Sequence, residues 1–254
     1  MELTMFKNKQ RVTVIVAWLI LVISAAVIIF SSVSLHGIKQ AYKESFAYYE
    51  SLQSLVRKNN KQEEYGKDFS LSIDFNELQG INNDLIAWLY SPNMALNYPV
   101  VMAKDYDWYF RHLPDDSQGA YGTPFLDIDG KTDFSKRLNV IYGKKIGNEE
   151  MFGSLSKYKK QDYFENNPYI YLYTKQGNYR IDLKYGATVR NGEWRARAFM
   201  YEANLESLLG YGEAKTTFKS DVEYDIDDKF IVLNALEKGY DKKSYFVVGV
   251  LRPI

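Results

Sequence analysis

The sequence predicts a mainly β domain with flanking helices, an α+β fold, preceded by one transmembrane helix. Two short apolar runs rich in β-branched residues, 230–233 and 245–251, are typical of buried strands. The chain contains 22 Tyr and 14 Phe residues in 254, which suits an aromatic-rich β fold. A third, uncharged run covers residues 12–35 at the N-terminus. It is long enough to cross a hydrocarbon core of ~30 Å as a helix.

The N-terminus predicts a membrane anchor with its first residues in the cytoplasm. Lys7, Lys9 and Arg11 precede the apolar run, and basic flanks stay on the cytoplasmic side. A cleaved signal peptide is the alternative, but its apolar region usually spans only ~7–15 residues and ends at an Ala-x-Ala-like site. We therefore expect a cytoplasmic tail at residues 1–11, an uncleaved signal anchor at residues 12–35, and a cell-membrane protein whose C-terminal domain is extracellular.

Residues 36–68 are predicted to form a stalk helix and a linker. Ile38, Tyr42, Tyr49, Leu52 and Val56 recur at helical spacing, with charged residues on the other face. We expect this helix to dock on the domain, the alternative being a helix that pairs with a partner protein. A polar linker follows at residues 59–66, and the domain itself covers residues 69–254.

The first half of the domain alternates predicted helix and strand. Residues 75–88 fit a helical period. Residues 96–101 indicate an edge strand, because Pro99 cannot donate to a ladder. A surface helix or loop is expected at 105–111, and strands at 123–128 and 138–142.

The second half contains the segments that close the domain. We expect a helix at 150–158, strands at 169–174 and 179–189, and a hairpin turn between them in which Gly177 is free to take positive φ. A helix is predicted at 205–209. The two apolar runs at 230–233 and 245–251 complete the domain.

Composition excludes several classes of site. Basic and acidic residues both number 32, so the basic excess that nucleic-acid binding requires is absent and we expect no nucleic-acid partner. The chain has no cysteine, which excludes disulfides and thiolate chemistry and is compatible with an exported protein of a Gram-positive bacterium. His36 and His112 are the only histidines, so neither a metal site nor a cofactor is predicted.

The order of several motifs resembles the class B sortase family. They are residues 81–88 (INNDLIAW), 96–101 (LNYPVV), 125–127 (FLD), 139–143 (NVIYG), 151–152 (MF) and 168–174 (PYIYLYT). The resemblance covers residues 69–251 and implies an eight-stranded β-barrel with N-terminal helices and a helix at 203–215 before the seventh strand. It further implies cleavage of a sorting signal on a secreted protein and transfer of the new carboxyl end to a cell-wall or pilin amine.

The positions that match the family's three catalytic groups carry other residues. Lys144 follows Tyr142 and Gly143 where the family has histidine, and Leu236 stands where it has the cysteine nucleophile. The family's arginine falls on Ser244 or Tyr245. Because these groups depend on one another, we expect no catalytic residues and a pseudoenzyme of the cysteine transpeptidase family.

The remaining site predictions concern the groove that the resemblance implies. Its candidate residues are Tyr106, Lys144, Trp194, Asn234 and Leu236. Lys144 is interpreted as a solvated loop charge in preference to a groove residue, and Leu236 as a plug in preference to a ligand contact. His112 and His36 are expected to be surface residues.

Two functions follow from these expectations. The first is a non-catalytic, membrane-anchored extracellular protein that binds or helps to assemble cell-wall or pilus proteins. Its partners would be sorting-signal-bearing surface proteins, pilins or an active sortase. The alternative is an active transpeptidase or hydrolase of sorting-signal peptides that uses Ser244 and Lys144 in place of a cysteine.

Overall fold

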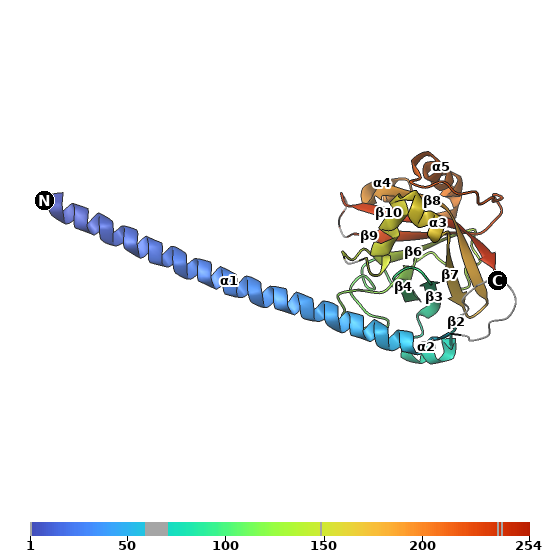
Figure 1. The fold of residues 1–254 in the computed structure, drawn as a ribbon, viewed down its shortest axis with the longest axis horizontal. Coiled ribbons are helices and arrows are strands. Elements are labelled where there is room, and N and C mark those ends of the chain that lie inside the picture. The colour runs from blue at the N-terminus through green and yellow to red at the C-terminus, as the bar shows by residue number, and fades with distance from the viewer. Residues whose placement is uncertain (1, 59–70, 148, 238, 240) are drawn as a thin grey trace. The chain divides into compact units, whose positions relative to one another are not determined.

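The structure, a computed structural model, describes residues 2–58, 71–147, 149–237, 239 and 241–254 (Figure 1). These residues fall into two compact units, Met1–Glu44 and Ser45–Ile254. The linker predicted at residues 59–66 lies outside the described residues.

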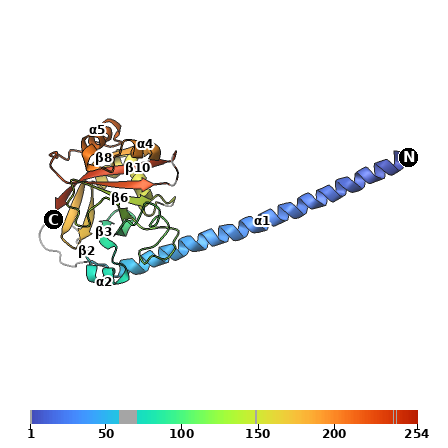
Figure 2. The same cartoon turned by 180° about the vertical axis from the view of Figure 1, so that it is seen from behind.

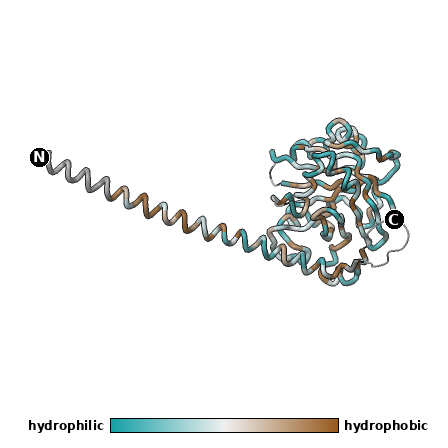
Figure 3. The backbone as a smooth tube through the Cα atoms, in the orientation of Figure 1, coloured by the Kyte–Doolittle hydropathy of each residue, from teal (hydrophilic) through white to brown (hydrophobic). Residues whose placement is uncertain are grey.

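The first unit consists of helix. Helix α1 runs without a break over Glu2–Ser54, so no structural boundary separates the predicted anchor from the predicted stalk. Its apolar stretch is brown in Figure 3, and side chains such as Leu19 and Ile23 are exposed. The helix is long and apolar enough to cross a membrane, which makes it a candidate span.

The last turns of α1 belong to the second unit. Tyr49 and Leu52, both on the predicted stalk face, are buried there. The Tyr49 hydroxyl donates to the carbonyl oxygen of Gly122, and Gln53 Nε2 donates to that of Asn97 at 2.8 Å. Part of the predicted apolar face of the stalk helix is therefore buried against other residues of this unit.

The second unit is a closed eight-stranded barrel with flanking helices, which confirms the predicted fold class (Figures 1 and 2). Its strand order is β10-β8-β7-β3-β4-β5-β6-β9. Two neighbouring pairs, β4–β5 and β6–β9, are parallel, and the others are antiparallel. The strands are β3 (Leu85–Ser91), β4 (Leu96–Met102), β5 (Phe125–Leu126), β6 (Leu138–Lys144), β7 (Tyr169–Thr174), β8 (Asn178–Arg190), β9 (Phe230–Leu236) and β10 (Lys243–Pro253).

Short helices and one small sheet surround the barrel. The small sheet pairs β1 (Arg57–Lys58) with β2 (Leu71–Ser72). The helices are α2 (Phe75–Ile81), α3 (Gln161–Asn166), α4 (Asn191–Ala196) and α5 (Leu205–Lys215), with 3-10 helices η1 (Phe152–Lys159) and η2 (Glu202–Asn204). Helices α4 and α5 lie in the long connection between β8 and β9, and α5 corresponds to the helix expected at 203–215. Both helices flank β8 and β10 (Figure 2).

The predicted helix at 75–88 is wrong in its second half. Helix α2 ends at Ile81 and strand β3 begins at Leu85. Every residue of β3 is buried, so the strand lacks the alternation that normally marks one. The apolar residues therefore matched a helical spacing by coincidence.

The strand predicted at 96–101 is present as β4, but its assignment as an edge strand is wrong. Strand β4 lies inside the closed barrel, paired with β3 on one side and with β5 on the other. The missing donor of Pro99 is tolerated because β5 pairs only with Val101 and Met102, beyond the proline.

Several smaller expectations also need correction. The predicted helix at 150–158 is the 3-10 helix η1, and the segment at 105–111 is an irregular loop that buries Tyr109 and Phe110. Positive φ occurs at other glycines and not at Gly177, whose turn is held instead by Thr174.

Candidate functional site

The register of β6, β9 and β10 brings the three family positions into one row. Lys144 on β6 pairs with Leu236 on β9. Ala235 on β9 pairs with Tyr245 on the antiparallel strand β10, so the next position in this register sets Leu236 opposite Ser244. Paired residues point to the same face of a sheet, and successive residues alternate. Lys144, Leu236 and Ser244 therefore share a face, whereas Tyr245 points to the other.

The next row on that face is covered by α4. It consists of Tyr142, Asn234 and Phe246, which pair across the same three strands. Trp194 of α4 packs against two of them, with ring centroids 6.5 Å from Tyr142 and 5.4 Å from Phe246. The helix thus forms one side of a site whose floor is the barrel wall.

A cavity of about 580 Å³ opens at this place. Its lining residues are Tyr106, Asp107, Phe110, Tyr142, Asn191, Trp194, Arg195, Met200, Tyr201, Leu236, Glu237 and Gly239. Three of the predicted groove residues, Tyr106, Trp194 and Leu236, are among them. Leu236 is half-buried on the cavity wall and does not fill the site, contrary to its interpretation as a plug.

Lys144 is not the solvated loop charge that the sequence indicated. Its side chain is half-buried, and Nζ donates to the carbonyl oxygen of Ala120 at 2.6 Å and lies 5.2 Å from the centroid of the Phe110 ring. Burial, together with the nearby charge of Arg111, lowers the pKa of Lys144. Lys144 thus ties the end of β6 to the loop that carries Phe110, a wall of the cavity.

Neither candidate for the family's arginine position lines the cavity. Ser244 is fully buried, and its hydroxyl has no hydrogen-bond partner among the described residues. The Tyr245 hydroxyl lies 2.6 Å from Thr217 Oγ1 on the other face. Because the Ser244 hydroxyl has no partner in the part of the chain that the structure describes and Lys144 Nζ donates to Ala120, the two side chains form no hydrogen-bonded serine–lysine pair.

Asn234 lies under the cavity wall in an unusual state. Its side chain is fully buried, and within the described part of the chain neither its oxygen nor its nitrogen has a hydrogen-bond partner. Leaving a buried polar group unpaired costs ~1–3 kcal/mol. Such a group requires an explanation, and its place near the end of β9 beside the cavity makes it a candidate site residue.

A buried carboxylate, Asp127, organises the opposite wall and was missed by sequence reasoning. The Tyr106 hydroxyl donates to Asp127 Oδ2 at 3.0 Å, and the backbone N–H of Asp129 donates to Asp127 Oδ1 at 3.0 Å. Burial raises the pKa of Asp127, and these hydrogen bonds oppose the rise. In the sequence it stood out only as the last residue of the FLD motif at 125–127, directly after the short strand β5.

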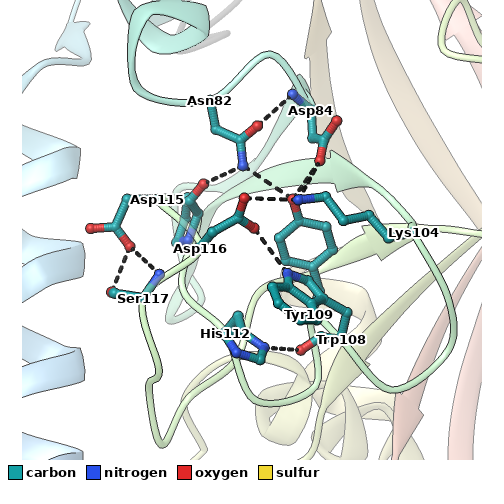
Figure 4. Close-up of polar contacts among 10 residues, drawn as sticks. Asn82, Asp84, Lys104, Trp108, Tyr109, His112, Asp115, Asp116 and Ser117 are labelled. Carbon is teal, nitrogen blue, oxygen red and sulfur yellow. Dashed lines mark hydrogen bonds and ion pairs between the residues drawn. The ribbon is translucent and has the colours of Figure 1, made fainter.

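The loop that carries Tyr106 and Phe110 is anchored by a second polar cluster, shown in Figure 4. Lys104 Nζ lies 2.8 Å from a carboxylate oxygen of Asp116 and 3.3 Å from one of Asp84. The Trp108 indole also donates to Asp116, and its ring stacks on His112 at 3.9 Å. The described residues hold no group of histidine and acidic side chains that could bind a metal ion.

Comparison with known proteins gives two curated relatives. The chain is 26% identical to sortase B of Staphylococcus aureus over 254 residues, which is 98% of each chain. It is 24% identical to sortase B of Listeria monocytogenes over 181 residues, 70% of this chain and 74% of the relative. No family model matches the chain.

Solved structures give the same fold. The crystal structure of S. aureus sortase B matches 71% of this chain and 87% of its own with a TM-score of 0.65 at 24% identity. A Bacillus anthracis sortase B structure matches 85% and 96% with a TM-score of 0.65 at 22% identity. These likenesses establish the sortase fold.

The comparisons correct one prediction. Both curated relatives are sortase B enzymes, and this contradicts the expectation that the chain is not an enzyme. The missing cysteine is a departure within a family of enzymes. It excludes a thiolate of this chain, but it does not by itself establish that activity is lost.

Proposed function

We propose, since this chain belongs to the class B sortase family, that it is a cell-surface protein that binds sorting-signal peptides in the cavity beside Leu236. Partners of this kind are surface proteins that carry a sorting signal, with pilins as one such class. A crystal structure of S. aureus sortase B with its substrate matches the fold of this chain and supports the choice of ligand.

The observation that carries the proposal is the open cavity at the end of β6 and β9. A volume of about 580 Å³ accommodates several residues of an extended peptide. The lining of the cavity is partly apolar and aromatic, with polar groups in between. The apolar and aromatic part consists of Tyr106, Phe110, Trp194 and Leu236. Aromatic walls with a few polar groups are what peptide and small-molecule sites have in common.

Membrane anchoring is part of the same proposal. The apolar part of α1 supplies the candidate span, and the basic residues Lys7, Lys9 and Arg11 favour a cytoplasmic N-terminal end by the positive-inside rule. The barrel would then stand outside the cell, where secreted proteins carry their sorting signals.

The geometry does not favour the alternative chemistry with Ser244 and Lys144. Leu236 stands between the two residues in their row, and neighbouring strands lie ~4.8 Å apart. Ser244 is buried away from the cavity, and Lys144 donates to Ala120. Turnover through this pair would require both side chains to move.

Peptide binding tests the proposal directly. The full chain in detergent is titrated with fluorescein-labelled peptides that span class B sorting signals, and anisotropy is recorded. We expect saturable binding that Leu236→Glu weakens at least about tenfold, since a carboxylate there loses apolar contact worth ~1.5 kcal/mol.

The matched control is Ile226→Glu, which places the same charge on an exposed apolar residue outside the cavity. This variant should bind like the parent. Equal weakening by both substitutions, or no saturable binding by the parent, would contradict the proposal. Chromatography of the same mixtures records cleavage, so binding and turnover are separated.

A further inference from the structure

The last turns of α1 hold one segment of the connection between β4 and β5, residues 119–123. The backbone N–H of Ala120 donates to Ser45 Oγ at 2.9 Å, and the Tyr49 hydroxyl donates to the carbonyl oxygen of Gly122 at 2.5 Å. Both helix side chains are buried. They lie four positions apart, so they project from the same face of the helix. Helix α1 thus contacts this segment through two hydroxyl groups one turn apart.

The segment in turn supports the part of the connection that carries Phe110. The Gly119 N–H donates to the carbonyl oxygen of Arg111 at 2.8 Å, and the Thr123 N–H donates to that of Tyr109 at 2.7 Å. These two bonds fix the backbone on both sides of Phe110, whose side chain lines the cavity. A wall of the cavity therefore rests on the segment that α1 contacts.

The backbone of one residue, Ala120, joins this support to the end of β6. Its carbonyl oxygen accepts a hydrogen bond from Lys144 Nζ at 2.6 Å, while its N–H is bonded to Ser45. Lys144 pairs with Leu236, which lines the cavity. A side chain of α1 and a side chain from the strand beside the cavity therefore hold the same residue.

We infer that Ser45 and Tyr49 are positioning residues that act on the cavity through residues 119–123, so that docking of the last turns of α1 is linked to peptide binding. The inference rests on the proposed function and names a regulation of that site. When the two hydroxyl contacts are lost, the wall at Phe110 loses support and peptide binds more weakly. Linkage is reciprocal, so bound peptide must stabilise the docked helix by the same factor. Since α1 also contains the candidate span, one helix would both anchor the chain and shape its binding site.

Hydrogen exchange with mass spectrometry measures the linkage in the parent chain. The full chain in detergent is compared with and without a saturating peptide that spans a class B sorting signal. We expect exchange at residues 45–54 to slow about threefold on binding, although none of these residues lines the cavity. Exchange in the turn between β7 and β8, residues 175–177, is the internal reference and should stay unchanged.

Ser45→Ala removes one contact with almost no change in shape. Peptide affinity should fall about threefold, which lies within the contribution of one hydrogen bond, and Tyr49→Phe should act in the same direction. Gln53→Ala is the matched control, because Gln53 lies on the same face of α1 and donates to the carbonyl oxygen of Asn97 on β4, outside the segment. This variant should bind like the parent.

A double variant shows whether the effect passes through Ala120. Ser45→Ala and Lys144→Met both release this residue, so their effects on peptide affinity should not multiply. The double variant should bind within about twofold of the weaker single variant. A product of the two single effects would mean that the two contacts act independently, and it would overturn the inference.

The remaining outcomes separate the linkage from the proposed function. Equal weakening by Ser45→Ala and Gln53→Ala would show a general loss of stability and overturn the inference. A parent that binds peptide without slower exchange at residues 45–54 would also overturn it, while leaving the proposed function standing. A parent that binds no peptide contradicts the proposed function. Exchange at residues 108–123 then decides, and the inference fails unless Ser45→Ala accelerates it more than Gln53→Ala does.

Discussion

At the scale of single residues, Lys144 shows how a half-buried lysine can hold a loop. Its side chain passes over the Phe110 ring and reaches the carbonyl oxygen of Ala120. Burial lowers the pKa of Lys144, so the ammonium is held at some cost and its hydrogen bond offsets that cost. Its role is to hold the loop.

Lys144→Met tests this role. Methionine keeps the length over Phe110 but cannot donate, and a hydrogen bond from a charged group contributes ~1.5–3 kcal/mol when both partners are buried. Since Lys144 is only half-buried, we expect a loss of about 1–2 kcal/mol in the free energy of unfolding, measured by urea denaturation.

Lys145→Met is the matched control for this substitution. Lys145 is exposed, and its ion pair with Glu237 at 3.7 Å should contribute below about 0.5 kcal/mol. A loss at position 144 no larger than that at 145 would show that the Ala120 contact contributes nothing to stability.

The residues of the site were only partly predictable from sequence. Tyr106, Trp194 and Leu236 were expected in the groove, and they do line the cavity. Asp127 and Asn191 were missed because their partners come from distant segments: Tyr106 for the first, Glu237 and Gly239 for the second. No spacing within the sequence encodes such pairings.

At the scale of elements, helix α4 decides the shape of the site. It is six residues long, too short for an apolar period to reveal it, and the sequence analysis predicted no helix there although it named Trp194 as a groove residue. It is fixed at its N-terminal end, where the Asn191 backbone N–H donates to the carbonyl oxygen of Lys242 at 2.9 Å and its side chain holds Glu237 and Gly239. The connection between β9 and β10 therefore positions Trp194.

Asn191→Ala should loosen this helix without unfolding the barrel. Two side-chain hydrogen bonds are lost, each contributing ~1 kcal/mol, so hydrogen exchange in α4 should accelerate about tenfold or more. The measurement is hydrogen–deuterium exchange with mass spectrometry on the full chain, and exchange in β7 and β8 should stay as in the parent.

Asn204→Ala serves as the comparison, because it removes a single bond of 3.3 Å to the carbonyl oxygen of Ala198. It should leave exchange at the start of α4 unchanged. If both variants accelerate that exchange equally, α4 is not held through Asn191.

At the scale of the whole molecule, the sequence predicted where several strands lie, but their local pattern did not predict that the strands close into a barrel. The runs at 169–174 and 230–233 carry enough apolar, β-branched or aromatic residues to be recognised as β7 and β9. The parallel pairing of β6 with β9, which brings Lys144 next to Leu236, joins segments that lie about half the length of the domain apart in the sequence. Only the resemblance to a known family indicated a barrel, since local pattern does not determine which strands pair.

The orientation of the chain is also a property of the whole molecule, and it remains a prediction. Lys39 and Lys43 lie on the exposed part of α1 between the candidate span and the barrel unit, which begins at Ser45. If residues 12–35 span the membrane with Lys7, Lys9 and Arg11 inside, trypsin added to intact protoplasts should cut after these two lysines. An N-terminal fragment of roughly 40 residues should stay with the membrane, detected by mass spectrometry.

Changing Lys7, Lys9 and Arg11 together to Glu removes the basic flank and should reduce the fraction of chains with an accessible barrel, because orientation follows the basic residues near the span. Complete protection of the parent chain from trypsin would overturn the orientation. Release of an intact barrel into the medium without trypsin would show that residues 12–35 act as a cleaved signal, in which case the barrel meets its peptide ligands away from the membrane.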